Sequence, residues 1–164
     1  HQLISGSVRW INIDEEGREF IQYLIEPGES FGELPLFDDK PYAVTAIADK
    51  DSIIIRLHKS AFIELLKENP ETHFEFSSLL ANRIRFKIFI LKEMVHHSPE
   101  HRLISLLNYF KEYKTNICTK CNLVKLTRQQ LADLTGLRVE TVIRTMRHLH
   151  DSGKLKIEKG KVYY

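Results

Sequence analysis

The sequence lacks the cysteines of a secreted scaffold and the hydrophobic runs of a membrane protein. Its two cysteines, Cys118 and Cys121, are too few for a disulfide framework, so a reducing cytoplasm is the expected compartment. The apolar stretches are short and interrupted by charge, as around residues 88–91, whereas a spanning helix needs about 20 apolar residues. No apolar segment of the signal-peptide kind opens the sequence. These absences predict a globular protein that has no membrane partner.

Motifs of the common enzyme classes are absent as well. The chain contains no phosphate-binding loop, no dinucleotide fingerprint and no Ser-His-Asp arrangement. The segment before Lys59 contains only His1 and His58, which are too few ligands for the metal site of a cupin-like enzyme. We therefore expect a protein that is not an enzyme.

Charge is distributed unevenly along the chain. Residues 1–97 carry 11 Lys and Arg against 16 Asp and Glu, whereas residues 98–164 carry 13 against 6. The formal net charge of +2 therefore hides an acidic first part and a basic second part. This asymmetry indicates two modules, of which the second has the charge expected for a polyanionic partner.

The first part of the chain has the pattern of short strands separated by turns. Residues 6–14 and 19–25 predict a hairpin around the polar turn at residues 15–17. Two more strands are expected at residues 43–48 and 52–57. A short helix should follow from Lys59 to about Asn69.

A long helix is predicted from about Glu71 to His96, and it has two apolar faces. One face carries a stripe spaced by three or four residues, formed by Phe76, Leu80, Ile84, Ile88, Leu91 and Val95. A helix that packs on one small core needs a single apolar stripe, so the second apolar face indicates a second packing partner. We interpret the stripe as a dimer seam whose opposite face packs on the β domain. A fully buried core helix is the alternative.

A helix-turn-helix is the expected structure of the basic part. Ser98-Pro99 favours the start of a new helix, because serine is a preferred N-cap and proline loses no hydrogen bond at the first position. Thr127 and Gln130 have capping-box spacing and open a short helix that runs through Leu134 and is broken by residues 135–137. A second helix should run over residues 138–152 and stop at Gly153.

The second of these helices has one apolar and one charged face. Val142, Met146 and Leu149 form the stripe expected to be buried, while the opposite side bears Glu140, Arg144 and Arg147. Arginine can grip guanine with two hydrogen bonds and glutamate can accept one from cytosine, although such charges are often only a solvated face. The lysines of a predicted hairpin would add phosphate contacts: Lys154, Lys156, Lys159 and Lys161.

Three motifs carry a resemblance to a known family. They are Gly6-Ser7-Val8, the run from Pro27 to Leu34, and the run from Gly136 to Arg144. With the long helix, they make the chain similar to the cyclic-AMP receptor protein and fumarate-nitrate regulator (CRP/FNR) superfamily. The resemblance implies an α+β fold with a cyclic-nucleotide-binding-like β-roll (residues 1–69), a dimerisation helix (70–97) and a winged helix-turn-helix (98–164).

The same resemblance implies partners and residue roles. It implies a homodimer on a palindromic operator in double-stranded DNA, with RNA polymerase as a further partner and with an N-terminal truncation of the β-roll. The family's base-reading residues fall on Glu140 and Arg144, and Val139 before them is similar to the fumarate-nitrate branch. Ile143 would meet a thymine methyl group, and Arg138 would contact phosphate. The other candidate DNA contacts are Thr127, Arg128, Thr141, Arg147 and Lys159.

The sequence does not identify the effector of the β-roll. The family's effector cassette is present in Gly32, Glu33 and Leu34, but the arginine that a cyclic phosphate needs is missing and only Lys40 offers a cation there. The sequence therefore argues against cyclic AMP, and no cofactor is evident. The alternative reading is a redox, haem or nitric-oxide sensing module whose output is the DNA-binding domain.

Metal sites are not expected from the cysteines or the histidines. Two thiols, at Cys118 and Cys121, are half of the four that an iron-sulfur cluster requires, and no further ligand lies near them in the sequence. The adjacent His96 and His97 lie at the hinge before the second module, where a haem or pH role and an incidental helix-end position are both open.

Overall fold

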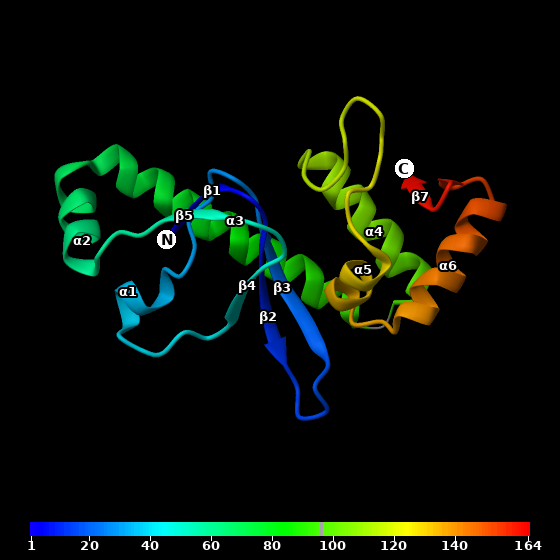
Figure 1. Ribbon diagram of the computed structural model, residues 1–164, viewed down its shortest axis with the longest axis horizontal. Helices are drawn as coiled ribbons and strands as arrows, with labels where there is room; N and C mark the ends of the chain where they lie inside the picture. Colours follow the sequence, from blue (N-terminus) through cyan, green and yellow to red (C-terminus); the bar gives the residue numbers. More distant parts are fainter. Residues whose placement is uncertain (96) are drawn as a thin grey trace. The chain divides into compact units, whose positions relative to one another are not determined.

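The computed structural model of the chain describes residues 1–95 and 97–164, and Figure 1 shows its helices and strands. His96 lies outside the described residues. The chain divides into two compact units, His1–Lys87 and Ile88–Tyr164, with the division inside one long helix. Within the described ranges, no helix combines the length and hydropathy that crossing a membrane requires.

The first unit is a small β-roll of antiparallel strands. Its strands are β1 (Gln2–Ser5), β2 (Val8–Ile13), β3 (Glu19–Ile25), β4 (Thr45–Ala48) and β5 (Ile53–Ile55). They pair in the orders β3-β2-β4 and β1-β5, so that the predicted hairpin is present as β2 and β3. Strand β1 and the short helix α1 (Leu34–Asp38) are additions that the sequence pattern did not predict.

The core of the β-roll comes from inward-facing residues on neighbouring strands. Leu3, Val8 and Ile25, one from each of β1, β2 and β3, are buried together with Phe31 from the segment after β3. The turn between β1 and β2 lies against the segment before β5. Gly6 has a φ of +106°, and a Cβ at this position would collide with Ser52. Glycine is therefore required where these two segments meet.

Two helices follow the strands. Helix α2 (Lys59–Glu68) begins after His58, whose ring accepts a hydrogen bond from the Ser60 backbone N–H at 3.4 Å. Helix α3 (Pro70–Met94) is the predicted long helix and ends two residues earlier than expected. Its two apolar faces have different surroundings, as the sequence pattern indicates.

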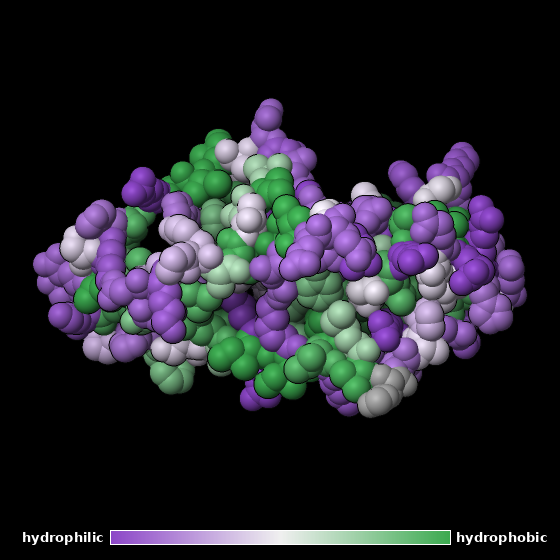
Figure 2. Space-filling model, turned by 90° about the horizontal axis from the view of Figure 1, so that it is seen from below, coloured by the Kyte–Doolittle hydropathy of each residue, from purple (hydrophilic) through white to green (hydrophobic). Residues whose placement is uncertain are grey.

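The exposed stripe of α3 differs from the predicted dimer seam at its start. Phe76 is directed into the β-roll unit, where its ring lies 5.0 Å from Phe62 and 6.0 Å from Phe37. Leu80 is half-buried. The apolar side chains that are exposed along this helix and just beyond it are Phe74, Ile84, Ile88, Leu91 and Val95. Figure 2 shows hydrophobic patches on one face of the molecule and mainly hydrophilic residues around the C-terminal helices.

The second unit contains three further helices and a hairpin. They are α4 (Pro99–Glu112), α5 (Arg128–Thr135), α6 (Val139–Asp151), β6 (Lys156–Glu158) and β7 (Lys161–Tyr163). Ser98 caps α4 as predicted, with its hydroxyl accepting from the His101 N–H at 3.3 Å. The core is formed by the apolar stripes of the three helices and by the hairpin: Leu103, Leu106, Leu107, Phe110, Leu131, Leu134, Val142, Met146, Leu149 and Val162.

Candidate nucleic-acid interface

Helices α5 and α6 form the predicted helix-turn-helix. The capping box is complete, since the Thr127 hydroxyl accepts from the Gln130 N–H at 3.1 Å and the Gln130 side chain accepts from the Thr127 N–H at 3.0 Å. Gly136 ends α5 with a φ of +63°, a conformation that glycine adopts without strain. This short turn places α6 directly after α5 (Figure 1). The local signals for both helices are thus confirmed.

Helix α6 presents a polar face because its apolar face is fixed in the core. Val142, Met146 and Leu149 are at most 1 % exposed. The opposite side forms an open hollow lined by Glu140, Ile143, Arg144, Arg147, His148 and Asp151. The structure therefore brings together the two predicted base readers and their neighbours. Val139 and Thr141 are only half-exposed at the side of this face.

Four charged side chains at this face have no partner in the part of the chain that the structure describes. Among the residues that the structure describes, no ion pair or side-chain hydrogen bond engages Arg138, Glu140, Arg144 or Arg147. Arg138 occupies the N-cap position of α6 without making a side-chain cap. These side chains are consequently free to meet an external ligand with both donors and acceptors.

The four lysines of the hairpin fall into two groups. Lys154 lies 2.6 Å from Glu100, where its ammonium holds the pKa of that carboxyl below its ordinary value. Lys156 lies 2.6 Å from Glu158, which raises the pKa of the lysine. Lys159 and Lys161 have no ion-pair partner in the described part of the chain. The unpaired lysines are at the tip of the hairpin, where Lys159 takes a φ of +47° in the turn.

Arg128 has a structural partner that the sequence did not reveal, whereas Thr127 has the capping partner that the sequence predicted. The Arg128 guanidinium donates to the Gly160 carbonyl at 3.0 Å, which links the start of α5 to the turn of the hairpin. Partial burial lowers the pKa of Arg128 from its ordinary value. The Thr127 hydroxyl is already used in the capping box. Both residues therefore position the interface, whatever further contacts they make.

A cavity of about 480 Å³ in the β-roll is the candidate effector site. Gly32, Glu33 and Leu34 of the predicted cassette line it, together with Trp10, Gln22, Phe31, Tyr42 and Lys87. Lys40, the fourth predicted cassette residue, does not line it. Lys40 lies in an exposed segment, where its backbone N–H donates to the Asp38 side chain at 3.1 Å.

Helix α3 contributes Lys87 to the lining of this cavity, and its Arg83 binds the lining residue Glu33. Arg83 donates to Glu33 at 2.7 Å, and both side chains are less than 10 % exposed. The guanidinium of Arg83 also lies over the Trp10 ring at 4.8 Å. Lys87 donates to the Gln22 carbonyl at 2.6 Å, and burial lowers the pKa of Lys87 to about 8. Sequence reasoning missed Arg83. The available signal was its position, because a charged residue within an apolar stripe of a helix indicates a buried charge that needs a partner.

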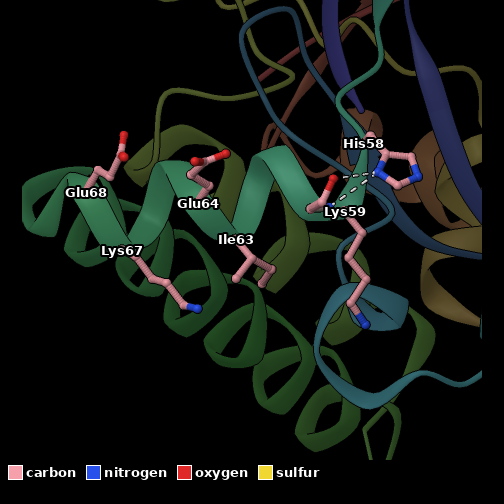
Figure 3. Close-up of a pocket in the computed structure, with 7 residues that line it drawn as sticks. His58, Lys59, Ile63, Glu64, Lys67 and Glu68 are labelled. Carbon is pink, nitrogen blue, oxygen red and sulfur yellow. Dashed lines mark hydrogen bonds between the residues drawn. The ribbon is translucent and has the colours of Figure 1, made fainter.

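Two other features have local explanations. Cys118 and Cys121 contact each other in the loop before α5, and the hydrogen bond from Cys121 lowers the pKa of the Cys118 thiol. An open hollow beside α2 is shown in Figure 3, where Glu64 and Glu68 project from one side of the helix and Lys67 from the other. These side chains are exposed and of mixed charge, so this hollow does not resemble a built site.

Comparisons with known proteins cover both units. Residues 1–69 match the cyclic nucleotide-binding domain family, and residues 101–163 match the Crp-like helix-turn-helix domain family. The cyclic AMP receptor protein of Thermus thermophilus is 27% identical over 160 residues, which cover 98% of this chain and 72% of the relative. The chain is thus similar to a regulator over nearly its whole length.

Solved structures agree with this similarity. A transcriptional regulator of the CRP/FNR family from Thermus thermophilus is 26% identical with a TM-score of 0.71, and the match covers 99% of this chain and 80% of that one. The c-di-GMP responsive global regulator CLP of Xanthomonas campestris shares the fold, with a TM-score of 0.76 at 19% identity over 99% of this chain and 82% of its own.

Proposed function

Because the chain belongs to the CRP/FNR family of DNA-binding transcription regulators, we propose that it acts as a homodimer on a palindromic operator. Helix α6 of each subunit lies in the major groove of one half-site, and the half-sites are about one helical turn apart. The observation that carries the proposal is the polar face of α6, held outward by its buried stripe, on which Glu140, Arg144 and Arg147 have no ion-pair partner among the described residues.

Each exposed residue of α6 has a role that its chemistry suits. Arg144 reads guanine through O6 and N7, Glu140 accepts from the amino group of cytosine, and Ile143, which is 38 % exposed, meets a thymine methyl group. The helix N-terminus and its flanking residues contact phosphates. This second group comprises Thr127, Arg138, Val139 through its backbone, Thr141, Arg147 and Lys159.

Arg128 positions the hairpin rather than reading bases. Its bond to Gly160 holds the turn that carries Lys159 beside the start of α5. The hairpin then acts as a wing whose lysine tip follows the phosphate backbone, which adds affinity without sequence information. RNA polymerase is the proposed protein partner of the DNA-bound dimer, and the cytoplasm is the compartment in which both would be met.

Operator selection followed by single substitutions tests the proposed readers. A site is selected from random duplexes with the full chain, and affinities are measured by fluorescence anisotropy at several salt concentrations. Arg144→Ala should weaken the selected site by about 1–3 kcal/mol and relax one base position. Lys159→Ala should weaken all sequences alike and reduce the salt slope by about 1.

Arg18→Ala provides the matched control for these variants. Arg18 is an exposed arginine of the β2–β3 turn, paired with Asp14 at 2.7 Å and distant in sequence from the helix-turn-helix. Its removal should leave both the affinity and the base preference unchanged. An Arg144→Ala protein that discriminates bases as the parent does would contradict the assigned role.

The proposed effector is a molecule other than cyclic AMP. Among the described residues, the lining of the cavity contains no arginine, and its ammonium from Lys87 is bound to Gln22. A cyclic phosphate requires a fixed cation with donors, which this lining does not supply. One relative is named for cyclic AMP and one structural neighbour for c-di-GMP, which supports the view that proteins of this fold differ in their effectors.

The chain carries its own reporter for this proposal. Trp10 is the single tryptophan and lines the cavity. Titration with cyclic AMP should leave the Trp10 emission unchanged, and calorimetry should detect no saturable heat. The operator affinity should also stay constant. A saturable response at micromolar cyclic AMP would overturn the proposal.

A further inference from the structure

Three side chains with metal-binding atoms meet where α3 ends and α4 begins. Glu93 lies in the last turn of α3, His97 in the connection and His101 in the first turn of α4. One ligand atom from each, a carboxylate oxygen and two imidazole nitrogens, lies within 4.8 Å of the others. The three residues are spaced by four along the chain. Because this spacing crosses the break between α3 and α4, the three residues do not form a stripe on one helix, and helical periodicity does not reveal the cluster.

The carboxylate of this cluster is buried without full compensation. Glu93 is 8 % exposed, and in the described part of the chain its Oε2 atom receives no hydrogen bond. Its neighbour is the Nε2 atom of His101 at 3.1 Å, which is a cation only when that ring is protonated. Removing a carboxylate from water is costly unless a cation or several donors replace the water. The position therefore calls for positive charge beside Oε2.

The two imidazoles lie face to face next to this oxygen. The ring centroids of His97 and His101 are 4.1 Å apart, and the ring planes differ by 18°. A neutral imidazole has one nitrogen with a free lone pair, so the pair offers two nitrogen ligands in a small volume. His101 is on the solvent side and His97 is half-buried, which leaves an open approach for an ion.

We propose that Glu93, His97 and His101 bind a divalent transition-metal ion, with zinc or ferrous iron as the type. Two imidazoles with one carboxylate suit these ions, whereas calcium and magnesium prefer an all-oxygen shell. Bond lengths of about 2.0–2.2 Å place ligand atoms about 3.4 Å apart in a tetrahedral site. Binding would rotate the two rings out of their stacked arrangement so that both nitrogen lone pairs point at the ion, and water would complete the coordination.

Arg102 connects this site to the helix-turn-helix. Its guanidinium donates to the carbonyls of Met94 at 2.9 Å, His97 at 3.1 Å and Thr135 at 3.3 Å. Thr135 is the last residue of α5. Arg102 thus joins the backbone between α3 and α4 to the end of α5. A metal ion would cross-link side chains of this same connection. Binding of the ion would make this connection more rigid, so the site has a route to the DNA-binding helices.

Metal titration of the full chain tests the proposal directly. The parent is the Cys118→Ser/Cys121→Ser double variant, because the two thiols are a competing soft site. Zinc binding is measured by calorimetry, and cobalt binding by its visible absorption without thiolate bands. We expect one equivalent per chain. Glu93→Gln, His97→Ala and His101→Ala should each weaken zinc binding at least tenfold.

His73→Ala is the matched control, because His73 is exposed on α3 and belongs to no such cluster among the described residues. This variant should bind zinc as the parent does. Thermal unfolding provides the second measurement: added zinc should raise the melting temperature of the parent and of His73→Ala but not of His101→Ala. His101 is half-exposed, so this variant should keep the fold.

Two results would overturn the proposal. One is the absence of saturable zinc and cobalt binding to the parent. The other is binding that survives all three ligand substitutions, which would place the ion elsewhere. Neither result depends on the proposed operator binding, since the titration contains no DNA. A simple ion pair between Glu93 and His101 predicts the first of these results.

Discussion

Lys87 is the residue at which burial and charge conflict most clearly. Its ammonium is bound by the carbonyl of Gln22 at 2.6 Å, and no carboxylate pairs with it among the described residues. The neighbouring Arg83 has such a partner in Glu33. Desolvation disfavours the charged form of a lysine, and here it lowers the pKa from 10.5 to about 8. Lys87 should thus make stability depend on pH.

The direction of this dependence follows from proton uptake. Between about pH 8 and pH 10.5 the unfolded chain keeps Lys87 protonated while the folded chain does not, so the unfolded state binds more protons and stability rises with pH. Lys87→Met should be more stable than the parent at pH 7, and its advantage should shrink as the pH rises through this window. Urea unfolding of both proteins at several pH values measures the difference. If the difference in unfolding free energy between Lys87→Met and the parent stays constant over this pH range, Lys87 is not a buried charge with a lowered pKa.

The residues of the effector cavity were only partly predictable. Gly32, Glu33 and Leu34 could be placed because they form one short motif. Lys87 lines the cavity and Arg83 binds Glu33 from a helix some 50 residues further along the chain, and residue spacing carries no information about such contacts. Lys40 was expected there because it is near the motif in sequence, but it lies in an exposed segment outside the lining.

At the scale of elements, the start of α6 is the weak point of the helix-turn-helix. Arg138 stands at its N-cap and leaves the first N–H groups of the helix without a side-chain acceptor. Helix α5, by contrast, has a complete capping box. A side chain that costs helix stability and carries an unpaired positive charge at this point suits a phosphate contact. The two roles can be separated by substitution.

Arg138→Ser should raise the stability of the fold and lower the affinity for DNA. Serine is a strong N-cap, so the free energy of unfolding should rise by about 1 kcal/mol, as measured by urea unfolding. Operator affinity should fall alike for all sequences, with a smaller salt slope, because a phosphate contact is lost. Arg138→Gln is the matched control: it removes the charge without adding a favoured cap, so only the affinity should fall. Unchanged affinity in both variants would exclude the phosphate contact.

The helices were predictable because their signals are local. Caps such as Ser98 and Thr127 and the stripe on α6 depend on neighbours within one or two turns, and the structure confirms them. The expected α+β fold with a β-roll, a long helix and a winged helix-turn-helix is also confirmed, as is a regulator rather than an enzyme. Strand β1 was missed, since its pairing with β5 spans about 50 residues of sequence.

The surroundings of α3 show the limit of periodicity. Both faces of the helix repeat apolar residues at helical spacing, so the sequence cannot tell which residues meet the aromatic side chains of Phe37 and Phe62. The structure assigns Phe76 to that contact and leaves Phe74 exposed on the other side. The second half of the predicted stripe is unaffected by this change. Ile84, Ile88 and Leu91 remain exposed.

For the whole molecule, the exposed stripe on α3 is the feature that points beyond one chain. Ile84, Ile88, Leu91 and Val95 are spaced by four, three and four residues, the repeat of a helix that packs along a second helix. They are each between 47 % and 65 % exposed in the single chain. A row of large apolar side chains in water is unfavourable, and a two-fold pair of such helices would remove it from solvent.

Ile88→Gln should therefore dissociate the proposed dimer while leaving each subunit folded. The polar amide would be buried without partners in a paired seam, whereas it is harmless on a free surface. Light scattering coupled to size exclusion measures the mass, and circular dichroism checks the fold. Leu65→Gln is the matched control, because Leu65 is an exposed leucine on α2 that lies off the stripe.

The same pair of variants connects oligomeric state to operator binding. If two subunits each hold one half-site, Ile88→Gln should lose most of its affinity for the full palindrome yet bind an isolated half-site as the parent chain does, since the reading face of α6 is intact. Leu65→Gln should behave as the parent on both duplexes. Equal binding of the palindrome by Ile88→Gln and the parent would mean that the stripe on α3 is not the seam, and that the subunits associate through another surface or bind DNA singly.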